Sequence, residues 1–234
     1  MVYSNNFVGV IKVNGQVLRE IDNVVTLPFN SEYTILLKNL DAKTAVINIT
    51  IDGQDVQDGS GLVLYGNTEV ELQGFLKGNS VKNKFKFIEK TEEISNHRGD
   101  RIDDGIVRIE YKFEKPLPRF FGNYYQYIPV YPFDNTVWKK YSFDSTVGLS
   151  TMSVQCCAEN DNGITVKGSD DVDQHFNYTT LRTLEENSNV IIIKLKGTKN
   201  SKPITVKDKI TCETCGRTSK YGVKYCHNCG TFIG

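Results

Sequence analysis

The chain has 234 residues, of which 39% are hydrophobic, and its 28 basic side chains balance its 28 acidic ones. A net charge of zero argues against a protein that binds nucleic acid over its whole surface. No apolar run approaches the roughly 18–20 residues that span a bilayer, and Met1–Asn6 has neither the basic flank nor the apolar stretch of a signal peptide. We therefore expect a soluble protein made in a reducing cytoplasm.

The first part of the chain reads as a succession of strands. Asn14-Gly15 separates two short apolar segments, which is a typical hairpin signal. Apolar and charged residues alternate in 107–114, where the apolar ones are Val107, Ile109, Tyr111 and Phe113. This period of two predicts a strand with one solvent-exposed face. The same reasoning predicts strands at 8–13, 17–20, 24–28, 32–40, 44–51, 61–65, 68–76, 84–90, 106–114, 163–167 and 189–196. Residues 179–186 form at most a short helix.

These strands predict an all-β fold. Eight or more short strands with frequent turns are typical of an antiparallel β-sandwich, of jelly-roll or immunoglobulin-like type. We assign residues 1–197 to this sandwich. Helix bundles and doubly wound α/β folds do not fit the pattern.

Residues 116–162 interrupt the succession of predicted strands. This segment holds four of the six prolines and the only tryptophan, together with many aromatic residues. One interpretation is an insertion with its own aromatic cluster. A second is a protein contact surface, because Tyr and Trp are enriched at interfaces. A third is a carbohydrate-binding surface. The candidate partner-binding residues are Tyr124, Tyr125, Tyr127, Tyr131 and Trp138.

The strongest motif lies at the C-terminus. Two Cys-x-x-Cys-Gly sequences, Cys212–Gly216 and Cys226–Gly230, are separated by ten residues between the inner cysteines. This spacing offers four thiolates to one tetrahedral ion, and in a reducing compartment it favours Zn²⁺ over disulfides. We expect one structural Zn²⁺ bound by Cys212, Cys215, Cys226 and Cys229 in a zinc ribbon at 210–234. His227 is an alternative ligand, which four cysteines make unnecessary. A Lys-rich linker at 198–209 precedes the ribbon.

Other polar motifs predict little chemistry. Arg98-Gly99-Asp100 lies in a polar stretch and reads as a loop with charge pairs rather than an adhesion motif. The acidic residues Asp170, Asp171 and Asp173, together with His175, occupy a turn-like segment. We interpret the adjacent Cys156 and Cys157 as buried or unreactive thiols. With three histidines and no nucleophile or phosphate-loop motif, we expect a protein that is not an enzyme and has no catalytic residues.

Three segments resemble a group of tailed-bacteriophage structural proteins. They are 13–20 (VNGQVLRE), 94–114 (ISNHRGDRIDDGIVRIEYKFE) and 163–169 (GITVKGS). Proteins of this group also end in a four-cysteine ribbon, and the similarity covers about 7–114 and 163–234 but not 116–162. The resemblance implies a virion-associated β-sandwich that decorates or cements a capsid, after synthesis in the host cytoplasm.

Three functions follow as expectations. The first is a virion protein bound to the major capsid protein or other virion proteins, with homo-oligomers possible and no membrane partner. The second is a zinc-ribbon adaptor for nucleic acid or a polymerase, which the balanced charge and the lack of a stacking pattern disfavour. The third is a carbohydrate-binding module that uses the aromatic segment.

Overall fold

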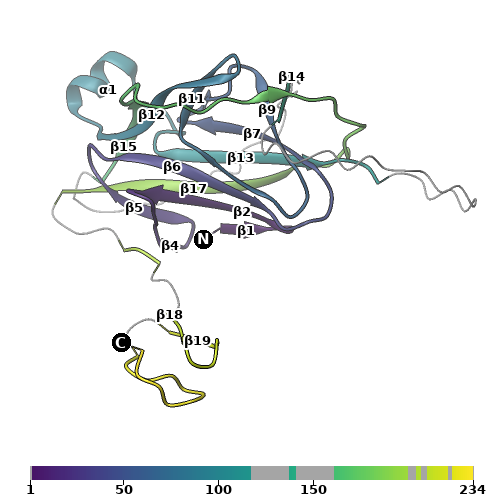
Figure 1. Ribbon diagram of the computed structural model, residues 1–234. Helices are drawn as coiled ribbons and strands as arrows, with labels where there is room; N and C mark the ends of the chain where they lie inside the picture. The colour runs from purple at the N-terminus through teal and green to yellow at the C-terminus, as the bar shows by residue number, and fades with distance from the viewer. Residues whose placement is uncertain are drawn as a thin grey trace, which may run out of the picture.

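The computed structural model describes residues 2–116, 161–199, 204–206, 210–220 and 223–233, and the backbone of 137–140. Within these residues the chain forms two large β-sheets that face each other, one short helix and a separate two-stranded unit at the C-terminus (Figure 1). The predicted β-sandwich is therefore confirmed. No helix among the described residues is long and apolar enough to cross a membrane.

The first sheet has eight strands. Its main path is β1–β2–β6–β12–β11, while β3, β10 and β15 pair at the sides of β2, β6 and β12. All of its pairings are antiparallel. The strands are β1 (Val2–Ser4), β2 (Phe7–Val13), β3 (Gln16–Val17), β6 (Glu32–Asn39), β10 (Glu69–Leu72), β11 (Gly74–Lys77), β12 (Ser80–Glu89) and β15 (Gly163–Lys167).

The second sheet has nine strands in the order β16–β14–β9–β7–β13–β17–β5–β4, with β8 beside β7. It is mixed, because β17 pairs in parallel with β5 and β14 in parallel with β16. The strands are β4 (Glu20–Ile21), β5 (Val24–Pro28), β7 (Ala45–Ile51), β8 (Gln54–Asp55), β9 (Ser60–Leu64), β13 (Ile106–Phe113), β14 (Val137–Lys140), β16 (Asn177–Tyr178) and β17 (Asn189–Thr198).

The core lies between the sheets and is built from the alternating residues. Phe7 of the first sheet stacks on Tyr111 of the second, with ring centroids 4.4 Å apart. Gly9 allows the two sheets to approach closely, because a Cβ built there would lie 2.7 Å from the Cδ1 of Ile109. In β13 every second residue is buried, as the period of two predicts. Burial of such side chains supplies the main driving force for folding.

Two local predictions need correction. The strand expected at 68–76 is two strands, because β10 pairs with β6 and β11 with β12, and the Gln73 N–H between them donates to the Gln174 side chain (3.1 Å). In the Arg-Gly-Asp triplet, Gly99 and Asp100 lie in a loop as predicted, but Arg98 is the last residue of the helix α1 (Glu92–Arg98), whose first turn is capped by the Thr91 side chain. Residues 179–186 contain no helix.

A buried carboxylate joins the two sheets at the end next to α1. Asp52, in the turn after β7, is 3% exposed. It accepts hydrogen bonds from the Gly105 N–H, just before β13, and from the Thr165 N–H in β15, both 2.7 Å long. We call this arrangement the Asp52 bridge. Burial raises the pKa of Asp52 from 3.8 to about 6, against the lowering effect of the two N–H donors and of Arg98.

Part of the predicted linker is attached to the sandwich. The Arg19 N–H donates to Ile204 O (2.7 Å), and the Val206 N–H donates to Val17 O (2.8 Å). Leu18, which is buried, faces Thr205 in a β-bridge. Residues 204–206 thus extend the edge of the first sheet beyond β3. We call them the strap.

Candidate metal centre

The C-terminal unit consists of two turns that repeat the same geometry. The first follows β18 (Ile210–Thr211) and leads into β19 (Thr218–Ser219), which pairs with it. The second is closed by a β-bridge between Tyr225 and Phe232. Each turn carries one Cys-x-x-Cys-Gly sequence, so the sequence repeat is also a structural repeat.

Backbone hydrogen bonds shape both turns in the same way. The N–H of Gly216 donates to Cys212 O (2.8 Å), and that of Gly230 donates to Cys226 O (2.9 Å). Both glycines have positive φ, 68° and 72°, a conformation that side chains with a Cβ disfavour. The chain can therefore fold back tightly enough to direct both sulfurs of each pair to one point.

The four cysteine sulfurs lie within 4.8 Å of one another. The Sγ atoms of Cys212 and Cys229 are 3.5 Å apart, and those of Cys215 and Cys226 are 3.6 Å apart. Sulfurs at the vertices of a tetrahedron around an ion at 2.3 Å would be about 3.8 Å apart. The predicted ligands are thus brought together as the spacing required, and the cluster fits one metal ion held by soft thiolate donors.

Hydrogen bonds prepare two of the four thiols, those of Cys226 and Cys229, for metal binding, whereas the pKa of the Cys215 thiol is raised. The backbone N–H groups of Cys229 and Asn228 lower the pKa of the Cys226 thiol to about 6. The hydroxyl and the backbone N–H of Thr231 lower that of Cys229. Since the thiolate is the form that binds a metal, fewer protons must be displaced at neutral pH than from unperturbed cysteines.

The other predicted polar motifs lie apart from this centre. His227 is exposed, and its Nδ1 contacts the Ser219 hydroxyl (3.2 Å) beside the cluster. His175 pairs with Asp173 at the surface. The predicted charge pairs around the Arg-Gly-Asp triplet are confirmed, because Arg98 pairs with Asp104 and Asp100 pairs with Lys90.

The predicted partner-binding residues are not brought to the metal centre by any described contact. Tyr124, Tyr125, Tyr127 and Tyr131 lie outside the described residues, as do Cys156 and Cys157. The backbone of Trp138 belongs to β14, where it pairs with Leu62 of β9 and Tyr178 of β16.

Sequence reasoning missed an aromatic pair on the surface of the C-terminal unit. Tyr225 and Phe232 are 61% and 62% exposed, and their rings meet edge to face with centroids 5.6 Å apart. The signal was present, since each aromatic residue lies within three residues of a ligand cysteine and must project from a unit too small for a core of its own. An exposed pair of this kind is typical of contact surfaces.

Comparisons with known proteins found no match to the chain among family models, curated proteins or solved structures.

The glycines of the two turns give a first testable prediction. Gly216→Ala should lower the affinity for Zn²⁺ about five- to thirtyfold, since a residue with a Cβ pays about 1–2 kcal/mol at positive φ. Nothing else lies within 4 Å of the added methyl group, so strain is the sole cause. Competition with a chromophoric chelator measures the affinity.

Two variants control this experiment. Gly216→Asn should bind Zn²⁺ more tightly than Gly216→Ala, because Asn tolerates this backbone conformation better. Gly15→Ala introduces the same strain in the sandwich, where φ is 75°, and should leave the affinity unchanged. Equal affinities for Gly216→Ala and the unmodified chain would show that the turn is not needed for binding.

Proposed function

We propose that the metal is Zn²⁺ and that its role is structural. Four thiolates fill a tetrahedral coordination sphere and leave no position for water or substrate. Cys212 and Cys226 are buried, at 0% and 2% exposure, although the surrounding unit is small. Ion binding then supplies the folding free energy of this unit, about 10–16 kcal/mol for comparable sites.

We further propose that the chain is a non-enzymatic structural protein of a tailed-phage particle, which decorates or cements the capsid. The observation that carries this proposal is the resemblance of the three segments to phage structural proteins. Two of these segments meet at the Asp52 bridge, since Gly105 belongs to 94–114 and Thr165 to 163–169. The segments that carry the resemblance therefore supply the N–H donors that hold the two sheets together, as a structural protein requires.

The polar interior supports a role without catalysis. The buried Asp52 accepts two backbone hydrogen bonds, and the buried Gln57 accepts one from the Ile49 N–H. Asp104 pairs with Lys90 and Arg98. Each of these groups holds a turn or a strand in place, which is a structural use of its charge or dipole.

The charge of the ribbon favours a protein partner over nucleic acid. Among the described residues of the C-terminal unit, Arg217, Lys220 and Lys224 are opposed by Glu213. A Zn²⁺ ion with four thiolates adds two negative charges, so the metal-bound unit is neutral. The exposed pair of Tyr225 and Phe232 suits a protein surface, and we propose the major capsid protein or another virion protein as the partner. The aromatic residues Tyr124, Tyr125, Tyr127, Tyr131 and Trp138 remain proposed contacts.

Mass spectrometry and immunogold labelling of purified particles test this function. Stoichiometric copies on intact particles are expected, with label on the capsid. Absence from clean particles would overturn the proposal.

Particle binding also gives a prediction for the ribbon. Tyr225→Ala should reduce the number of copies on the particle at least about fivefold at limiting protein concentration, because a central aromatic contact is worth about 1–2 kcal/mol or more. Tyr3→Ala, which removes a similarly exposed tyrosine from β1, should have no effect. Zinc content should stay unchanged in both. Equal loss in the two variants would exclude the ribbon as the contact.

A further inference from the structure

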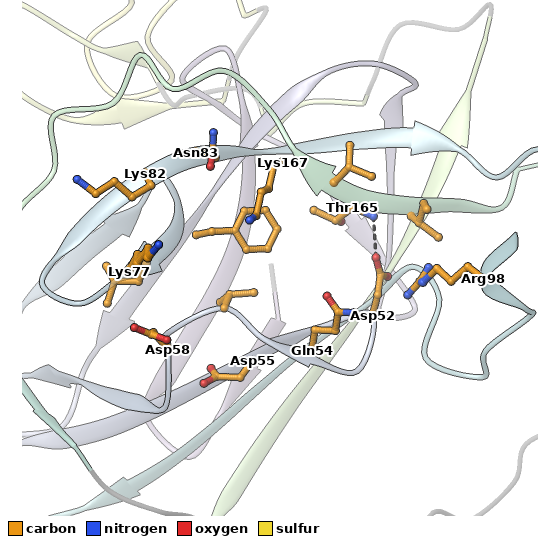
Figure 2. A pocket seen from close by; sticks show the side chains of 15 residues that line it. Asp52, Gln54, Asp55, Asp58, Lys77, Lys82, Asn83, Arg98, Thr165 and Lys167 are labelled. Carbon is orange, nitrogen blue, oxygen red and sulfur yellow. Dashed lines mark hydrogen bonds between the residues drawn. The ribbon is translucent and has the colours of Figure 1, made fainter. Parts of the chain in front are cut away.

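A groove of about 990 Å³ opens between the two sheets, beside the Asp52 bridge (Figure 2). One wall comes from β8 and the loop after it, and the other from β11, β12 and β15. The Asp52–Thr165 hydrogen bond closes one end (Figure 2). Leu76 and Val56 also line the groove, and the Leu76 N–H donates to Val56 O, 2.8 Å away. We call this space the inter-sheet groove.

The acidic side chains of the groove are already engaged by backbone donors. Asp55 accepts from the N–H groups of Gln57 (2.9 Å) and Gly59 (2.6 Å). Asp58 accepts from the Gly78 N–H (3.1 Å), and Asp52 is held in its bridge. These N–H dipoles partly offset the negative charge of the three carboxylates. The turns that the carboxylates stabilise also fix their orientation.

The lysines of the groove are not engaged in this way. Lys77, Lys82 and Lys167 are exposed and form no ion pair with any residue that the structure describes. Figure 2 shows Lys77 and Lys82 toward one end, Arg98 at the other and Lys167 between them. Other lysines of the sandwich, such as Lys12 and Lys43, have acidic partners. The groove thus presents three lysines that form no ion pair, beside three aspartates whose oxygens accept backbone hydrogen bonds.

The backbone of β15 adds a second kind of recognition. Within the described part of the chain, β15 pairs with β12 alone, so its other edge faces no strand. On that edge the Thr165 N–H is already donated to Asp52, so an added strand can pair only beyond Thr165, toward Lys167. Val56, Phe75 and Ile164 form an apolar floor of the groove, where Phe75 is partly exposed and the other two are buried. An edge strand beside an apolar floor can accept an extended peptide as an additional strand.

We propose that the inter-sheet groove binds an extended acidic segment of a partner polypeptide alongside β15. The lysines select glutamate or aspartate side chains by charge complementarity, the strand edge supplies main-chain hydrogen bonds, and the floor accepts apolar residues in alternate positions. This inference is independent of particle association, since the groove lies on the sandwich and can be tested with the isolated protein.

Binding of a labelled peptide to the full-length, zinc-loaded chain tests the proposal. The probe is a fluorescein-labelled nonapeptide of alternating Glu and Val, and fluorescence anisotropy reports its affinity. The triple variant Lys77→Gln, Lys82→Gln, Lys167→Gln should weaken binding at least about threefold, because it removes three charge contacts at the surface. A control variant, Lys194→Gln, Lys220→Gln, Lys224→Gln, removes the same charge from exposed sites outside the groove and should bind normally.

Amide chemical shifts then locate the peptide. Shifts concentrated at 54–58 and 163–167 support the groove, whereas shifts confined to other residues overturn it. Equal binding by the two triple variants, or equal binding of a Lys/Val peptide, also overturns the proposal. A ten-residue oligothymidylate that binds the groove more tightly than the peptide would reassign it to single-stranded nucleic acid. Each of these results leaves the particle experiment unaffected.

Discussion

Cys226→Ser should abolish stoichiometric metal binding and unfold the C-terminal unit while the sandwich stays folded. Serine cannot supply the thiolate, and three remaining cysteines leave the coordination sphere open. The unit has no other source of stability of the same size, because its largest apolar side chains, Tyr225 and Phe232, are exposed. Elemental analysis gives the metal content, and amide spectra separate the two parts of the chain.

A cysteine outside the cluster provides the control. Cys156→Ser removes one thiol of the six and should leave one Zn²⁺ per chain. One tightly bound Zn²⁺ per chain in Cys226→Ser would contradict the four-thiolate centre. Loss of the sandwich signals together with the ribbon would show that the two parts fold as one unit.

Asp52→Ala should lower the free energy of unfolding of the sandwich by about 3 kcal/mol or more. The change leaves the buried N–H groups of Gly105 and Thr165 without an acceptor, at about 1–3 kcal/mol each. It also places Ala at φ 51°, which adds about 1 kcal/mol. Urea unfolding followed by circular dichroism measures the loss. A loss below about 1 kcal/mol would mean that water replaces the carboxylate.

The pH dependence of the same site has a defined sign. Because the pKa of Asp52 is raised from 3.8 to about 6 in the folded protein, its protonated form is favoured there. The contribution of this carboxyl to stability is present below pH 3.8 and is lost as the pH rises through about 6. Asp52→Asn keeps the backbone conformation and removes the titration, so comparison with it cancels the other groups.

The stability advantage of the unmodified chain over Asp52→Asn should therefore shrink as the pH rises from 4 to 7. The total change is at most about 3 kcal/mol, from the distance between the two pKa values. Above pH 7 the difference should be constant. An advantage that grows with pH would show that the two N–H donors outweigh burial and hold the pKa below its ordinary value.

What the sequence predicts well is local. The alternation in 106–113 is matched by burial of every second residue of β13, because a strand in a sandwich has one face in the core. The cysteine spacing was equally informative, since all four ligands lie within 18 residues and the turns between them are short. The helix α1 also had a signal in Thr91, Glu92 and Gly99, but none of its residues is buried, so no apolar period marks it.

The sequence does not predict the features that segments far apart in the chain form together. The parallel pair of β5 and β17 joins residues about 170 positions apart, and nothing in either strand specifies that partner. Asp52 reads as an ordinary Asp-Gly turn residue, and its burial depends on Gly105 and Thr165. The inter-sheet groove takes its lysines from three strands. Such sites depend on the topology, which period and spacing do not encode.

The strap limits the distance between the C-terminal unit and the sandwich. Its last residue, Val206, is hydrogen-bonded to the sandwich, and the ribbon begins at Ile210. Four residues of fully extended chain reach about 14 Å at most. On the proposed contacts of the ribbon and the sandwich, binding of one module to the particle would confine the other to a small volume and so give it a high effective concentration. Weak contacts at each module then combine into durable attachment, provided that both docking points lie within that reach.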